Sequence, residues 1–180
     1  ELAAADIAMN WLKHVARVTS NAGLALHWET AIGFTVFQNY RSLETTEVRI
    51  TWGGKRQVLS LETQGSNLHA GRQISSVAPN FVHSQDACHL MITVNNCVNN
   101  GIKDFAMIHD SFGTHACNTG MLNEVLRECF IAMYSGNMLD DLWHQVRQQV
   151  SADTFALIEP PPDQSTLEIE AVRDSLYFFA

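Results

Sequence analysis

Apolar residues recur at helical spacing in several stretches of the chain. Between Leu2 and about Ser20 they line one face, and Gly23 follows as a residue that can adopt the left-handed conformation in which many helices end. The same spacing predicts three further helices, from Phe81 to about Asn99, from about Thr119 to Tyr134 and from about Leu139 to Val150. Gly101 is placed to end the first of these three.

Aromatic and β-branched residues predict hairpins between the helices. They flank Gly33 within residues 24 to 40, which is typical of two strands around a turn. A second hairpin pairs Glu47–Thr51 with Gln57–Leu61 through Gly53-Gly54. Two hairpins are therefore expected in the first part of the chain.

Other segments lack a clear period. Residues 64 to 80 carry turn formers and Pro79, so we expect the next helix to begin only after that proline. Residues 160 to 163 read as an irregular surface segment, and the apolar end from Leu176 to Ala180 is expected to dock, because exposed aromatic clusters are uncommon. The mixture of helices and hairpins indicates an α+β fold, with residues 1–180 as one unit and no separate domains.

Composition limits the class of protein. With 46% hydrophobic and 17% charged residues the chain reads as an ordinary soluble domain. It has no uninterrupted apolar run of the roughly 18 residues that a spanning helix needs, and no signal-peptide pattern, so we expect no membrane partner and a cytoplasmic setting, the host cytoplasm if the protein is viral. The net charge of -8 argues against a free-standing nucleic-acid binder, since Lys and Arg supply most non-specific affinity.

The cysteines are read as small buried apolar residues. Cys88, Cys97, Cys117 and Cys129 are even in number, but none forms a C-x-x-C pair. The alternative is a zinc site that uses Cys88 and His89 with Cys97, which the absence of tight paired spacings disfavours.

A third hairpin carries the chemistry. Residues 105 to 108 form a short apolar strand, and residues 112 to 116 can pair back on it, which leaves His109, Asp110 and Ser111 at the tip. A buried strand holds a carboxylate rigid while the turn exposes it, and nucleotidyl transfer needs rigid oxygen ligands for Mg²⁺. From spacing alone the alternative remains open that Asp110 is simply a turn former.

Two sequence blocks resemble one enzyme family. Residues 109 to 114, His-Asp-Ser-Phe-Gly-Thr, resemble motif C of the single-subunit RNA polymerases of phages and mitochondria. Residues 78 to 90 resemble the helix before that motif in the same family. Further agreement lies at residues 8–13, at His27-Trp28, at Gly33-Phe34, at residues 36–40 and at residues 178–180. The resemblance covers nearly the whole chain.

The resemblance implies a DNA-directed RNA polymerase, a nucleotidyltransferase that works with Mg²⁺ ions. Asp110 would be a catalytic metal ligand, and His109 would help to shape the site near the RNA end. His83 would contact the primer terminus and the incoming nucleotide, and Ser84 and Gln85 would support the same contacts. Without the surrounding block, His83 would be read as a helix or core histidine.

The same resemblance implies a fold and partners. The third hairpin would be a palm-type antiparallel hairpin packed against helices, with an additional β-hairpin region near the N-terminus. Partners would be a DNA template, the RNA product, ribonucleoside triphosphates and an upstream polymerase segment. In the family that segment carries the second catalytic aspartate and the Lys/Arg/Tyr helix, which are absent here, so the chain alone is expected to be inactive.

Some positions depart from the family pattern. Ala31 and Thr35 stand where the family usually has prolines, and the chain ends in Tyr-Phe-Phe-Ala rather than alternating Phe and Ala.

Ser111 favours an RNA polymerase over a family A DNA polymerase, which has Glu after the motif aspartate. A hydrolase built on Ser111, His109 and Asp110 is weaker, since no G-x-S-x-G elbow surrounds the serine. A non-catalytic, polymerase-derived interaction or remnant domain is the remaining alternative.

Overall fold

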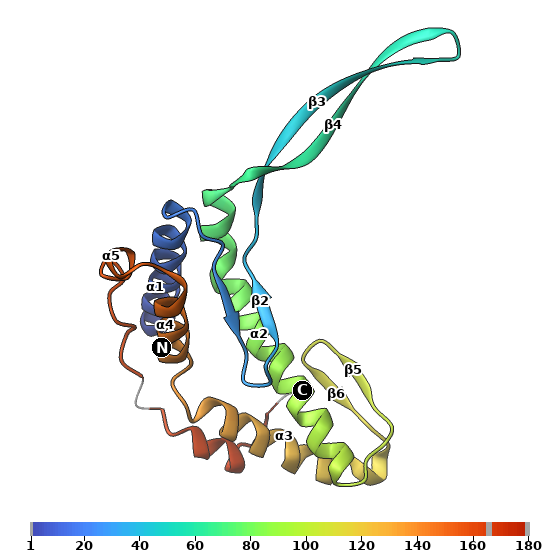
Figure 1. Cartoon of the computed structure of the whole chain (residues 1–180). Coiled ribbons are helices and arrows are strands. Elements are labelled where there is room, and N and C mark those ends of the chain that lie inside the picture. Colours follow the sequence, from blue (N-terminus) through green and yellow to red (C-terminus); the bar gives the residue numbers. More distant parts are fainter. Residues whose placement is uncertain (1, 165–166, 179–180) are drawn as a thin grey trace.

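The computed structural model describes residues 2–164 and 167–178 and has an α+β architecture, which confirms the predicted class (Figure 1). Its α-helices are α1 (Leu2–Asn21), α2 (Ala70–Asn99), α3 (Thr119–Tyr134), α4 (Met138–Gln149) and α5 (Ala152–Phe155), with 3-10 helices η1 (Ala116–Asn118) and η2 (Ile169–Asp174). The strands are β1 (His27–Glu29), β2 (Thr35–Phe37), β3 (Arg41–Trp52), β4 (Lys55–Leu68), β5 (Ala106–Ile108) and β6 (Ser111–Gly113). They form three separate antiparallel hairpins, β1–β2, β3–β4 and β5–β6. None of the described helices is long and apolar enough to span a bilayer.

The main core joins segments that are far apart in the sequence. Helix α1, the first half of α2, strand β1 and helix α4 all contribute side chains to it. Its buried apolar residues are Trp11, Leu12, Val15, Ala16, Leu26, Trp28, Val77, Ala78, Phe81, Leu142, Val146 and Ile158. Helices α1 and α4, more than a hundred residues apart in the sequence, thus share one core with α2, the longest described helix.

A smaller core lies under the β5–β6 hairpin. Cys97 at the end of α2, Ile102 and Leu122 of α3 are buried there, and Phe105 and Phe112 pack against them. The hairpin is thus backed by the end of α2 and the start of α3, as predicted. Gly101, with a φ of 91°, ends α2 as expected and allows the turn into this hairpin.

Helix α2 begins at Ala70 rather than after Pro79, so the prediction for residues 64 to 80 was wrong. A proline inside a helix costs roughly 3 kcal/mol, because it removes a backbone hydrogen bond and crowds the preceding turn. Gln73, Val77 and Phe81, spaced four residues apart, form a continuous buried stripe on both sides of Pro79. The packing of this stripe carries the helix through the proline, and the polar Gln73 hid the periodicity.

The second and third hairpins differ in length from the predicted ones. The second extends to β3 and β4, longer than the predicted strands 47–51 and 57–61, although its turn at Gly53-Gly54 was correct. In the third, β6 covers only Ser111–Gly113 instead of residues 112 to 116. His109 has a φ of 55°, which allows a two-residue loop, so pairing starts one residue earlier and Ser111 belongs to the strand.

The remaining expectations were largely met. Helices α1 and α3 have the predicted bounds to within about a residue, and α4 is shifted by one. Three cysteines are buried as predicted, but Cys117 is exposed because it lies in η1 on the surface. Phe178 docks edge-on to Phe130, with 5.0 Å between ring centroids, while Leu176 and Tyr177 stay exposed. The rest of the predicted apolar end, residues 179 and 180, lies outside the described residues.

Candidate functional site

Asp110 lies at the tip of the β5–β6 hairpin. The register pairs Ile108 with Ser111, so His109 and Asp110 alone form the loop. Both side chains are exposed, and Asp110 makes no hydrogen bond or ion pair within the described part of the chain. Its two carboxylate oxygens are therefore directed to solvent and available to a ligand.

The hairpin packs on the helices behind it, and one of its contacts there is aromatic. Phe112, two residues after Asp110, meets the buried ring of His89 edge-on, with 5.6 Å between centroids. The Nε2 of His89 lies 3.0 Å from the Leu126 carbonyl, which can only accept, so this nitrogen carries the proton. Burial lowers the pKa of His89, which keeps the ring neutral. The hairpin that carries the Asp110 carboxylate is therefore packed against α2.

The three predicted residues on α2 have different surroundings. The His83 side chain is exposed. The Ser84 hydroxyl donates to the Phe81 carbonyl over 2.7 Å and accepts from the indole Nε1 of Trp28 over 3.0 Å. Gln85 is buried. Successive residues of a helix point about 100° apart, so one short segment serves solvent, strand β1 and the interior at once.

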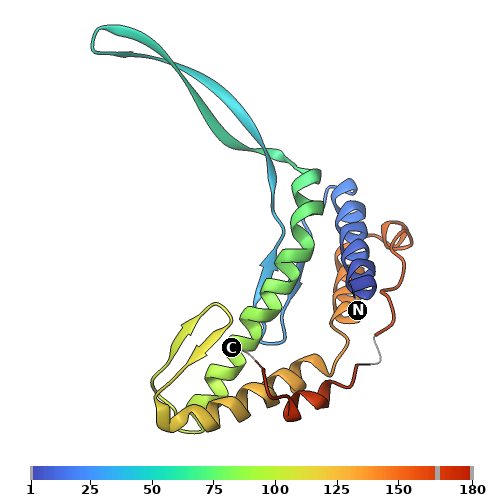
Figure 2. The ribbon, with the colours of Figure 1, turned by 180° about the vertical axis from the view of Figure 1, so that it is seen from behind.

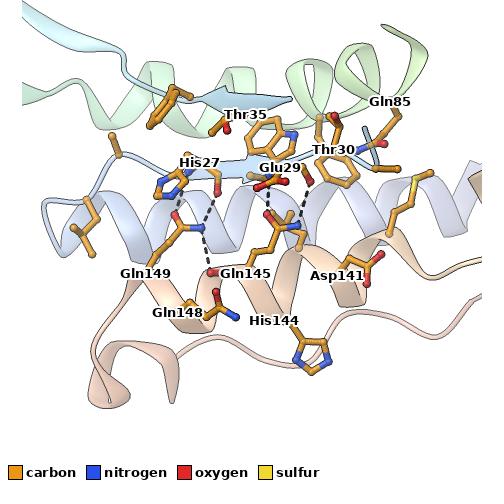
Figure 3. A pocket seen from close by; sticks show the side chains of 18 of the residues that line it. His27, Glu29, Thr30, Thr35, Gln85, Asp141, His144, Gln145, Gln148 and Gln149 are labelled. Carbon is orange, nitrogen blue, oxygen red and sulfur yellow. Dashed lines mark hydrogen bonds between the residues drawn. The ribbon is translucent and has the colours of Figure 1, made fainter. Parts of the chain in front are cut away.

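A groove of about 910 Å³ lies between the β1–β2 hairpin and α4 (Figure 3). Gln85 lines it, together with residues such as Glu29 and Asp141, but His83, His109 and Asp110 do not. The groove and the predicted metal ligand are therefore separate places in the fold. Of the residues predicted for the site, the structure brings only Gln85 to this groove.

Two glutamines of α4 bind the free edge of β1 in Figure 3. Gln149 accepts from the His27 backbone N–H over 3.2 Å and donates to the His27 carbonyl over 2.7 Å. Gln145 does the same with the backbone of Glu29, at 2.7 and 3.2 Å. Four helical residues rise about 6 Å and two strand residues about 6.6 Å, so the spacings match.

The contact of these two glutamines with β1 was not predicted from the sequence. Their spacing of four residues on a predicted helix was the available signal, because it places both side chains on one face. Nothing in the local sequence indicates that this face meets the edge of a strand more than a hundred residues away.

A metal site has to be judged from the donors present. Within residues 2–164 and 167–178, no three His, Cys, Asp or Glu side chains gather as a metal-binding group. This disfavours the zinc alternative at Cys88, His89 and Cys97. Mg²⁺ is usually held by one or two carboxylates, with water and substrate phosphates completing its six oxygens. The exposed, unpaired carboxylate of Asp110 fits one such ligand and leaves the others to be supplied from elsewhere.

Comparisons with known proteins agree on one family. A family model described as DNA-dependent RNA polymerase matches residues 2–158. The chain is 35% identical over 171 residues to DNA-directed RNA polymerase 3, chloroplastic, of Nicotiana sylvestris, covering 95% of this chain and 17% of that relative. It is 34% identical over 176 residues to DNA-directed RNA polymerase 1, mitochondrial, of Arabidopsis thaliana, covering 98% of this chain and 17% of the relative. The chain thus spans about 17% of the length of these relatives.

Proposed function

The chain belongs to the DNA-dependent RNA polymerase family, and on that premise we propose that it forms the part of such a polymerase that supplies the metal ligand Asp110. The polymerase would join ribonucleotides to the 3′ end of an RNA along a DNA template. The observation that carries this proposal is the placement of Asp110 at the tip of a packed hairpin with both oxygens unpaired.

Mg²⁺ is the proposed metal. When bound, it would neutralise charge on the transferring phosphate and orient the attacking and leaving oxygens. The chain's own contribution is to hold one carboxylate in a fixed position, through the contact of Phe112 with His89. Because Asp110 is the single residue here that resembles a family metal ligand, the second carboxylate would come from a polymerase segment outside these 180 residues.

Four further residues are proposed to serve the same reaction. His109, beside Asp110, would shape the site near the RNA end, and His83, exposed on α2, would contact the primer terminus and the incoming nucleotide. Ser84 and Gln85, the next two residues of α2, would support the contacts of His83. The hydrogen bond of Ser84 to Trp28 and the burial of Gln85 fix the turn of α2 that presents His83.

Contact with the DNA template needs positive charge, which the chain concentrates in one place. Residues 48 to 59, around the turn of the β3–β4 hairpin, contain Arg49, Lys55 and Arg56 and no acidic residue, although the whole chain has a net charge of -8. Such a cluster is suited to phosphates. We propose that this turn is the chain's main electrostatic contact with nucleic acid.

The finer structural and cellular assignments are part of the same proposal. The β5–β6 hairpin would be the palm-type element of the polymerase, supported by its packing on α2 and α3. The relatives are named as chloroplastic or mitochondrial enzymes, while the cytoplasmic setting for this chain rests on the sequence prediction alone.

The test is primer extension with the purified chain, a primed DNA template, Mg²⁺ and ribonucleotides. The reaction is run with and without a separately produced upstream part of a polymerase that contains this chain. We expect template-dependent RNA only after mixing. RNA synthesis by the chain alone would contradict the shared site, and no synthesis by a folded mixture would favour a remnant domain. Incorporation of deoxyribonucleotides in preference would favour a DNA polymerase relative.

A further inference from the structure

The β3–β4 hairpin has one apolar and one polar face. Cross-strand partners lie on the same face, and the register pairs Val48 with Leu59, which places these two on one face with Ile50, Trp52 and Leu61. We call these five residues the apolar hairpin face. The opposite face carries the pairs Thr51 with Arg56, Arg49 with Val58, Glu47 with Ser60 and Thr45 with Glu62.

The apolar hairpin face is open to solvent. Trp52 is 73% exposed, Leu61 50% and Leu59 43%, values that are high for large apolar side chains gathered in one patch. Figures 1 and 2 both show the hairpin extending away from the helices, and beyond its root no described element lies against it. A two-stranded hairpin that stands alone in water is marginally stable at best.

The root of the hairpin is firmly held, so its direction is set by the body of the protein. The Tyr40 carbonyl accepts from the His69 N–H over 2.9 Å and from Gln73 Nε2 over 3.3 Å. Gln38, fully buried, accepts from Asn80 Nδ2 over 3.3 Å. The root of the hairpin is therefore fixed relative to α2.

We propose that the apolar hairpin face docks on the polymerase polypeptide outside this chain, the part that the relatives carry beyond the matched 17% of their length. The charge distribution favours polypeptide over nucleic acid as the occupant. Arg49 and Arg56 point to the opposite face, and Lys55, the cross-strand partner of Trp52 next to the turn, adds a single cation to the five apolar side chains. The hairpin would then use its polar face and turn for nucleic acid while the apolar face is covered by protein. The inference rests on family membership and not on the role of Asp110.

Neighbouring residues of β4 provide a matched test. Leu59 belongs to the apolar hairpin face, whereas Val58 lies on the opposite face and is equally apolar. A photoreactive phenylalanine analogue is placed at either position in a full-length polymerase that contains this chain, with primed template bound. The cross-linked products are identified by mass spectrometry.

Position 59 is expected to cross-link to polymerase residues outside this chain at least about fivefold more than position 58, because successive side chains of a strand point to opposite faces. Equal yields, products of position 59 with DNA or RNA, or products with a second copy of the polymerase would overturn the inference. The same yields are expected in the Asp110→Asn enzyme, so failure of docking is distinguishable from failure of the proposed catalytic role.

Limited proteolysis of the same polymerase supplies a second measurement. Leu59→Ser should release the hairpin and speed cleavage near Gly53-Gly54 several-fold, whereas Val58→Ser should change the cleavage rate little. Both variants remove an apolar side chain, but only Leu59 belongs to the face proposed to dock. Equal acceleration by both variants would show that the apolar hairpin face is not covered.

Discussion

Trp28 donates a hydrogen bond from its indole Nε1 to the hydroxyl of Ser84 over 3.0 Å, and this bond ties strand β1 to the middle of α2. The Trp28 side chain is 1% exposed and packs on Phe81, with 5.6 Å between ring centroids. The N-terminal hairpin and the helix segment that presents His83 are thereby held in one fixed relation.

Ser84→Ala should lower the free energy of unfolding by about 1 kcal/mol, because the buried indole N–H loses its acceptor. Chemical denaturation of the purified chain measures this. Trp28→Phe removes the donor, so the double variant should lose less than the sum of the two single variants. Additive losses would show that the bond contributes nothing measurable.

Asp110→Asn should abolish RNA synthesis by a polymerase that contains this chain. The amide is nearly the same size as the carboxylate but lacks the charge that a Mg²⁺ ligand needs, and the side chain is exposed, so the unfolding temperature should stay unchanged. Transcript yield with Mg²⁺ present is the measurement. Asp104→Asn is the control, since Asp104 is an exposed carboxylate near the base of the same hairpin. Normal yield from the Asp110 variant would remove it from the site.

Gln149→Ala should destabilise the chain by roughly 1 to 3 kcal/mol, because the backbone N–H and carbonyl of His27 both lose their partner in a partly buried position. Gln148→Ala is the matched control on the same helix, since its side chain is exposed. Thermal unfolding compares the two. Equal losses would mean that helix propensity, not the bond to β1, decides the effect.

The docking of η2 on α3 should weaken in acid. Arg173 binds Glu128 through two hydrogen bonds of 2.6 and 2.9 Å, and this contact lowers the pKa of Glu128. A depressed carboxyl pKa stabilises the fold above the ordinary glutamate value of about 4.3, and the contribution is lost as pH falls through the lower folded value. An NMR titration of the Arg173 Nε–H signal should follow this loss.

Two variants sharpen the pH prediction. Glu128→Gln should reduce the pH response of the Arg173 Nε–H signal but not remove it, because Arg173 also binds the carboxylate of Glu170 over 2.7 Å. Glu124→Gln, which changes an exposed carboxylate on the same helix, should leave the response unchanged. An undiminished response in Glu128→Gln would assign the pH dependence to Glu170 or another group. High salt should weaken the contact as well, because the pair is exposed.

The sequence predicts elements best where packing follows local periodicity. Helix α3 was predicted correctly because its apolar spacing is uninterrupted, and the tip position of Asp110 followed from an apolar strand and a turn. The start of α2 was missed because a buried polar residue, Gln73, stands where an apolar one was expected, and because Pro79 argued for a boundary. Propensity is a weak guide when tertiary contacts oppose it.

The contacts around the site could not be predicted from local sequence patterns. That Ser84 bonds to Trp28, or that Gln145 and Gln149 bond to β1, depends on segments brought together from distant parts of the chain. The residue types were visible, but their partners were not. The expected roles of His83 and Asp110 came from a family resemblance, and their exposure is consistent with contact to something outside the chain.

The glutamines of α4 also determine what the β1–β2 hairpin cannot do. A sheet edge with free N–H and C=O groups is a template for another strand, and this is a common route to aggregation. By satisfying the backbone groups of His27 and Glu29, the side chains of Gln149 and Gln145 close that edge. The hairpin can therefore stay short without recruiting a foreign strand, a safeguard that a helix rather than a charge or a proline provides.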